Sequence, residues 1–188
     1  MTMRPFLVLS LASLRLFGCD GEPSGTTVSG SIELSRTSGG EVGQTGFTFP
    51  EDTLLDGGPF VGSCQVEDVG GVQILSLSID HTAPDAFGLA SFSLEAALDG
   101  APAAGGVKVT AEAGGTTFED AAGTCTLTFG DTEEGHHGHH DGDEKRHRDR
   151  FDLVLSCSSL AGAPAGETVA LSANLSLDEC EPAEREER

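Results

Sequence analysis

Residues 169–177 read VALSANLSL, with an apolar side chain at every second position from Val169 to Leu177. Strict alternation of apolar and polar residues is typical of a β-strand that buries one face and exposes the other. The stretch therefore predicts a strand with one apolar face to cover, and the same pattern recurs along much of the chain.

Shorter stretches with the same two-residue period are separated by Gly, Asp and Pro, which favour turns. Together they predict about nine strands, and a slip in the pattern at Ser91 predicts a β-bulge. The apolar positions of these strands are Val28, Ile32 and Leu34; Phe47 and Phe49; Phe60, Cys64 and Val66; Leu75, Leu77 and Ile79; Phe87, Leu89, Phe92, Leu94 and Ala96; Val107, Val109 and Ala111; Cys125, Leu127 and Phe129; Phe151, Leu153, Leu155 and Cys157; and the odd positions of 169–177.

Strands with one apolar face must cover that face with a second layer or by closure. We therefore expect an all-β fold, an antiparallel β-sandwich of Ig-like or jelly-roll type. Helix signals are nearly absent. Only residues 176–188 are candidates for a short acidic helix, and their charge favours a frayed tail instead.

The composition excludes some classes of partner. The 188 residues include 31 acidic and 10 basic side chains, for a formal net charge of −21, and no Trp or Tyr. Nucleic-acid binding needs clustered Lys and Arg, and binding to anionic lipid through charge needs them too. The chain length suits one domain with tails.

The N-terminus has the features of a secretory signal. Arg4 supplies a positive charge, and the apolar run 6–14 is too short to span a bilayer. The run ends in Leu16-Phe17-Gly18-Cys19, which resembles the lipobox of bacterial lipoproteins, although Phe17 and Arg15 depart from the usual pattern. Cleavage by the general signal peptidase is the alternative, but no Ala-x-Ala site lies nearby.

The resemblance to lipoproteins implies cleavage before Cys19 and lipidation of that residue, which anchors the chain to a membrane of the cell envelope. Asp20 resembles an inner-membrane retention signal of enteric bacteria, and the choice of membrane stays open. The expected organisation is a signal peptide at 1–18, a lipidated Cys and flexible tether at 19–30, a sandwich at 31–180 and an acidic tail at 181–188.

Four cysteines remain besides Cys19, and an even number in an exported domain predicts two disulfides with three possible pairings. Cys125 and Cys157 each lie on the apolar face of a predicted strand, and one long loop joins the two strands. This arrangement favours a bond between them. Cys64 would then pair with Cys180. A zinc site is the alternative, but the sequence has no C-x-x-C motif.

The segment from Cys125 to Leu160 is similar to small lipoproteins of Gram-negative soil bacteria, myxobacteria especially, in which two Cys-bearing strands flank an acidic loop. Phe151 and Cys157 stand farther apart here than in that pattern. The resemblance covers about 35 residues. It implies a disulfide-linked hairpin and an envelope location, but no activity.

The loop at 130–150 contains five of the six histidines. Clustered His in a short tract favours Zn²⁺, Cu²⁺ or Ni²⁺, and carboxylates can complete the metal shell. The candidate ligands are His136, His137, His139, His140, His147, Asp141 and Asp143. Because binding would have to order the loop, weak and exchangeable metal capture is expected.

Two other interpretations of this loop stay open. One is a solvated polar loop without a metal. The other is a pH-sensitive segment, because protonation of its histidines would turn its net charge from negative to positive.

Catalytic motifs are poorly supported. The sequence has no G-x-S-x-G motif, and His81, the one histidine outside the loop, is expected in a turn. The neighbouring acids Glu51-Asp52 and Glu119-Asp120 are expected in solvated turns. We therefore expect a membrane-anchored, non-catalytic binding or structural module of the envelope. Metal capture by the loop is the alternative, and an unrecognised hydrolase a weaker third.

Overall fold

The computed structural model describes residues 25–38, 44–86, 88–98, 106–130, 149–163 and 166–182. Within these ranges the chain forms ten strands and no helix. The strands are β1 (Thr27–Ser38), β2 (Gln44–Leu54), β3 (Phe60–Val69), β4 (Val72–His81), β5 (Leu89–Ala97), β6 (Val107–Ala113), β7 (Thr116–Glu119), β8 (Cys125–Phe129), β9 (Asp149–Ala163) and β10 (Thr168–Pro182).

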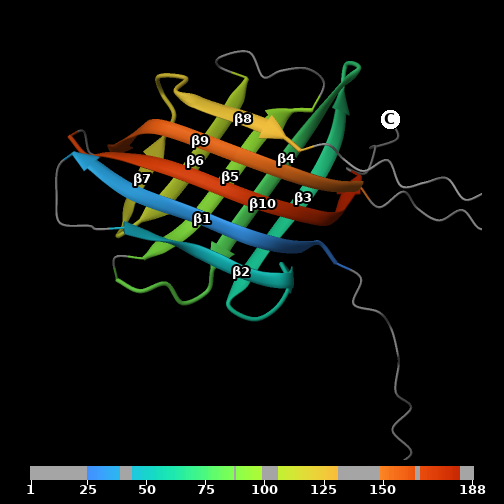
Figure 1. The fold of residues 1–188 in the computed structure, drawn as a ribbon, viewed down its shortest axis with the longest axis horizontal. Helices are drawn as coiled ribbons and strands as arrows, with labels where there is room; N and C mark the ends of the chain where they lie inside the picture. Colours follow the sequence, from blue (N-terminus) through green and yellow to red (C-terminus); the bar gives the residue numbers. More distant parts are fainter. Residues whose placement is uncertain are drawn as a thin grey trace, which may run out of the picture.

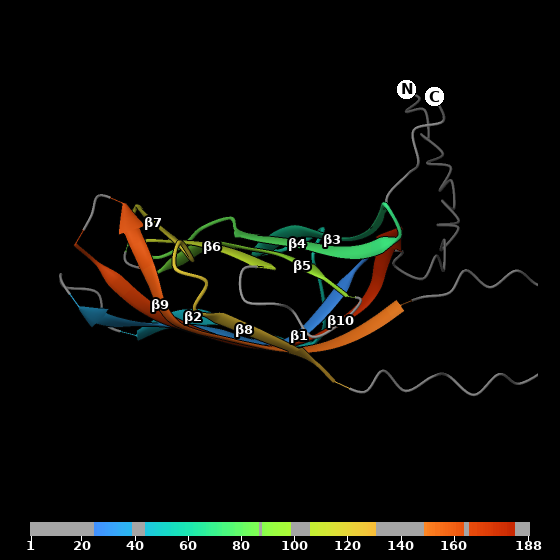
Figure 2. The same cartoon turned by 90° about the horizontal axis from the view of Figure 1, so that it is seen from above.

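The strands form two layers packed face to face, which confirms the predicted all-β sandwich (Figures 1 and 2). One layer has the order β2-β1-β10-β9-β8, and the other has the order β3-β4-β5-β6-β7. Most pairings join strands that follow one another in the chain. This up-and-down order differs from a Greek key, which the Ig-like and jelly-roll types use, because short hairpins connect most neighbours.

Two short pairings join the layers. The end of β10 runs parallel to β3 over two residue pairs, Glu181 with Gln65 and Pro182 with Val66. The end of β9 runs antiparallel to β7 over three residue pairs. We call these pairings the β10–β3 seam and the β9–β7 seam. They close a circuit of strands around the core, and β2 and β8 stand at the two ends of the strand order among the described residues.

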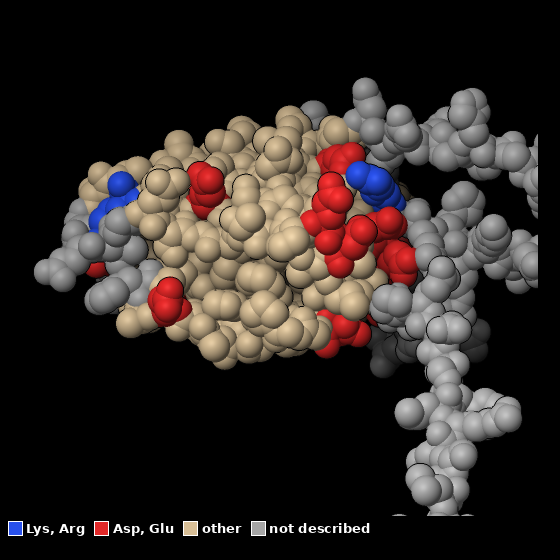
Figure 3. All heavy atoms as spheres, turned by 60° about the horizontal axis from the view of Figure 1, so that its bottom comes forward, with Lys and Arg blue, Asp and Glu red and all other residues tan. Residues whose placement is uncertain are grey.

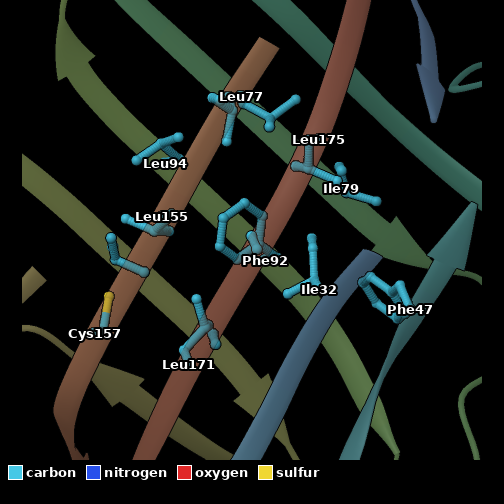
Figure 4. Packing of buried hydrophobic residues seen from close by; sticks show 14 of the residues in the cluster. Ile32, Phe47, Leu77, Ile79, Phe92, Leu94, Leu155, Cys157, Leu171 and Leu175 are labelled. Carbon is cyan, nitrogen blue, oxygen red and sulfur yellow. The ribbon is translucent and has the colours of Figure 1, made fainter. Parts of the chain in front are cut away.

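Most of the core consists of inward positions that the alternating pattern predicts, and it also contains Leu55, Phe118 and Leu160, which the pattern did not include. Of the predicted positions, Phe60, Val66, Phe129 and Phe151 are only partly buried, and Phe87 lies outside the described residues. In 169–177 all five apolar residues are buried, and Phe92, Ile32 and Leu155 meet between the layers (Figure 4). Burying such side chains stabilises the fold by roughly 1.5–3 kcal/mol each. The alternation on each strand therefore follows from the two-layer architecture.

Three expectations need correction. Strand β7 was not expected, because Phe118 is its one buried residue and alternation cannot show in so short a run. Strand β1 begins at Thr27, inside the expected tether, because Val28 is buried opposite Leu177. The helix considered for 176–188 is wrong as far as Pro182, the last described residue, because β10 continues to that point.

The continuation of β10 depends on a change of parity. Odd-numbered residues face inward up to Leu177, whereas Cys180 is even-numbered and also buried. A register shift between Leu177 and Cys180 makes this possible, and Glu179 there has a left-handed φ of 63°. The bulge predicted at Ser91 is confirmed, since the pairing of β5 with β6 shifts register between Leu89 and Ser91.

Candidate functional site

The residues predicted to carry lipid or metal lie outside the described part of the chain. They are Cys19, His136, His137, His139, His140, His147, Asp141 and Asp143. The lipid anchor and the metal site therefore stay predictions. The structure does describe the residues on either side of the His-rich segment and the residues that follow the expected tether.

Both predicted disulfides are confirmed. Cys125 of β8 stands opposite Cys157 of β9, with their Cα atoms 4.0 Å apart, and Cys64 of β3 is bonded to Cys180 of β10. All four cysteines are buried in the core. Structural disulfides of this kind are typical of proteins that fold in an oxidising, non-cytoplasmic compartment.

Asp120 organises the turn that leads into β8. Its carboxylate accepts hydrogen bonds from the backbone N–H of Thr124 at 2.7 Å, the Thr124 hydroxyl at 3.1 Å and the backbone N–H of Cys125 at 2.9 Å. Desolvation raises the pKa of this carboxyl, but hydrogen bonds from Thr124, Cys125 and Gly123 outweigh it, so its pKa lies below the ordinary 3.8. The sequence predicted only a solvated turn here, because its pattern does not show which backbone groups the carboxylate accepts.

Acidic side chains gather at one end of the sandwich, whereas the middle of the face that Figure 3 shows has few charges. Register places the start of β1 and the ends of β2 and β10 together, since Thr27 pairs with both Leu54 and Asp178. We call this region the acidic end. Its members are Glu51, Asp52, Asp56, Asp152, Asp178, Glu179 and Glu181.

The residues that flank the His-rich segment also lie at the acidic end. On one side, the N–H of Gly130 donates to the carbonyl of Asp152. On the other side, Asp149 pairs with Cys180, and Arg150 lies 3.8 Å from Asp152 in an ion pair. The described residues on both sides of 131–148 therefore lie in a region of negative potential, which attracts cations.

The outer face of β3, β4, β5 and β6 carries a row of hydroxyl groups. Ser63 pairs with Ser78, Ser78 with Ser93, and Ser93 with Thr110, so that one hydroxyl from each strand lies in line across the sheet. The hydroxyl oxygens of Ser63 and Ser78 are 3.2 Å apart. The row lines an open hollow of about 370 Å³, which also takes in Ser76, Leu77, Leu94, Glu95 and Lys108. We call it the hydroxyl groove.

The charges inside the hydroxyl groove cancel. The ammonium of Lys108 lies 2.6 Å from a carboxylate oxygen of Glu95, and these two are the charged residues in its lining. The next row along the strands contains Asp80 and Glu112, paired through Ser91. The groove is thus a neutral surface within a strongly acidic protein.

His81 lies at the end of β4 and not in a turn. Its ring packs against two aromatic rings, with centroids 5.1 Å from that of Phe60 and 5.8 Å from that of Phe47. This contact assigns His81 to the aromatic cluster that covers the core beside β2.

The described residues contain no group of three or more His, Cys, Asp or Glu placed to hold a metal ion. Nor do those residues include a helix with the length and apolar character needed to cross a membrane. Known protein families, curated proteins and solved structures contain no match to this chain.

Serines at alternate positions of 74–80 and 91–97 were visible in the sequence, but their alignment into one row was not. The alignment depends on the register between strands, which the hairpin geometry sets.

Proposed function

We propose that this chain is an exported, lipid-anchored, non-catalytic binding or structural module of the bacterial cell envelope. The observation that carries the proposal is the pair of buried disulfides between strands, because such bonds persist in the oxidising compartments that a signal peptide leads to. The lipobox-like sequence at 16–19 supports the lipid anchor in this proposal.

The start of the domain suits an anchor at Cys19. Six residue steps separate Cys19 from Gly25, the first described residue. A chain of that length spans at most about 20 Å. Lipid on Cys19 would therefore hold the sandwich close to the bilayer with its acidic end towards the anchor.

The hydroxyl groove supports binding over catalysis as the role of the outer face. Its serine hydroxyls have neither a histidine nor a free base in the lining, since Lys108 is paired with Glu95. A serine hydroxyl is a poor nucleophile without an adjacent base. Groups of this kind suit recognition through hydrogen bonds.

Mass spectrometry of the protein from a bacterial host tests the anchor. We expect a mature chain that begins at Cys19, carries acyl groups and has its other four thiols oxidised. The Cys19→Ala variant should lack the acyl groups. A chain that begins at Met1 with every thiol free would refute the proposal.

Capture of Zn²⁺, Cu²⁺ or Ni²⁺ by the His-rich segment is the second candidate. The acidic end favours it, because Gly130 bonds to Asp152 and Asp149 pairs with Cys180, next to Glu179 and Glu181, and negative charge raises the local concentration of cations. Calorimetry on the mature domain, with and without residues 131–148, tests this function. Micromolar binding that needs the segment would support it, and equal heats from both proteins would refute it.

A further inference from the structure

The hydroxyl groove has a regular geometry. Ser63, Ser78, Ser93 and Thr110 stand on four adjacent strands and in register. Neighbouring strands lie about 4.8 Å apart, so the row extends for roughly 14 Å across the sheet. A surface of this length can lie along more than one unit of a linear polymer.

The chemistry of the row suits a polyhydroxylated ligand. Each hydroxyl can donate one hydrogen bond and accept two, and it rotates to suit its partner. Ser76 and Ser93 are exposed. Leu77 and Leu94 also border the groove but are only 2% exposed because their side chains point into the core, so the outward serine and threonine side chains form its surface. A sugar presents the complementary groups, hydroxyls that can both donate and accept hydrogen bonds.

Charge narrows the class of ligand. The groove contains one cation and one anion, and these form an ion pair with each other. The chain carries a formal net charge of −21, and Asp80 and Glu112 border the groove. An anionic polymer would be repelled, whereas the bordering carboxylates can accept hydrogen bonds from neutral hydroxyl groups.

We propose that the hydroxyl groove binds a neutral polysaccharide chain, laid across β3, β4, β5 and β6. The proposal deepens the binding role proposed above and rests on it. The row of hydroxyls supplies the hydrogen bonds, and the Lys108–Glu95 pair lies beside the row in the lining of the groove.

Electrophoresis of the folded domain through native gels that contain a neutral polysaccharide tests the proposal. The panel is dextran, a β-glucan, galactomannan and xylan, with polygalacturonate as the charged comparison. We expect at least one neutral polymer to retard the domain and polygalacturonate to leave its mobility unchanged. Retardation by polygalacturonate alone, or by none of the polymers, would overturn the proposal.

The double variant Ser78→Val/Ser93→Val locates the binding. Valine favours strands, so the exposed face should keep its fold while two hydroxyls at the centre of the row are lost. We expect the apparent affinity to fall about tenfold or more.

Ser156→Val/Ser172→Val is the matched control. These serines are exposed and pair across β9 and β10 on the outer face of the other layer. The control should bind like the wild type, and an equal loss in both double variants would refute the assignment to the groove. Failure of the polysaccharide panel would leave the Cys19 mass measurement unaffected, so the two proposals fail separately.

Discussion

Replacing Asp120 with Ala should destabilise the sandwich although this residue lies outside the core. The carboxylate accepts three hydrogen bonds from Thr124 and Cys125, and it fixes the chain at the first residue of β8. The Thr124 hydroxyl also lies 2.9 Å from the carbonyl of Ser159, so its single proton is shared between that carbonyl and the Asp120 carboxylate. Loss of the carboxylate leaves the two backbone N–H groups without their acceptor.

The expected loss in the free energy of unfolding is set by the charge of the Asp120 carboxylate, which accepts the hydrogen bonds. A hydrogen bond to a charged group contributes about 1.5–3 kcal/mol, and removing a capping carboxylate costs about 0.5–2 kcal/mol. Water can reach this partly exposed turn and replace some of the lost bonds. We therefore expect the free energy of unfolding to fall by about 2 kcal/mol in Asp120→Ala and by about 1 kcal/mol in Asp120→Asn, which keeps one acceptor oxygen.

Urea unfolding followed by far-UV circular dichroism measures this effect, since the chain has no Trp or Tyr for intrinsic fluorescence. Glu119→Ala is the control, because Glu119 is the exposed neighbour on β7 and its loss should change stability by less than about 0.5 kcal/mol. Equal stability of Asp120→Ala and Glu119→Ala at pH 7 would refute the reasoning.

The pH dependence gives a second test of the same carboxylate. Its pKa in the folded state lies below the ordinary 3.8. The stabilisation is therefore fully present above the unfolded pKa and is lost as the pH falls through the folded pKa. The difference in the free energy of unfolding between the wild type and Asp120→Asn should be constant from pH 7 to pH 5 and should shrink below pH 4. A gap of the same size at pH 2.5 would contradict the assignment.

Three further predictions concern the disulfides, a close-packed glycine and the His-rich segment. Replacing both cysteines of Cys64–Cys180 should lower the free energy of unfolding by about 5 kcal/mol, against about 4 kcal/mol for Cys125–Cys157, because the closed loops span 116 and 32 residues. A larger loss for the shorter loop in urea unfolding would contradict this order. Gly62→Ala should cost about 2 kcal/mol or more, since its Cβ would lie 2.1 Å from the carbonyl oxygen of Ser78, whereas Gly57→Ala, with nothing within 4 Å, should leave the urea midpoint nearly unchanged. Removing residues 131–148 should abolish retention on a nickel column, and retention of the shortened chain would contradict the assignment of metal affinity to the histidines.

Alternation in the sequence was enough to predict the sandwich and most of its strands. Over residues 75–79 of β4, 107–113 of β6 and 169–177 of β10, every second residue is apolar because one face packs against the other layer. The same parity predicted the Cys125–Cys157 bond, since both residues face inward on paired strands. A two-residue pattern predicts which side chains are buried because successive residues of a strand point to opposite faces of the sheet.

The pairing of distant strands could not be predicted in the same way. The predicted Cys64–Cys180 bond brings β3 to the end of β10, but nothing in the sequence indicates that the two strands also pair in parallel there. The turn at Glu179 that brings Cys180 inward is a single left-handed residue without a glycine to mark it. The hydroxyl groove was missed for the same reason, because its four hydroxyls come from four strands and align only through register.

The β10–β3 seam shows that the stability of this fold does not depend on the surface proposed to bind a ligand. The β10–β3 seam has only two backbone residue pairs, and the Cys64–Cys180 disulfide lies directly beside it. The covalent bond therefore reinforces the point where the circuit of strands has the fewest backbone pairs, while the apolar core stabilises the rest. Because neither contribution involves the outer side chains, the hydroxyl groove can change its hydrogen-bonding groups without loss of the fold. Substitutions there should alter binding far more than stability, which is the behaviour expected of a recognition surface on a rigid scaffold.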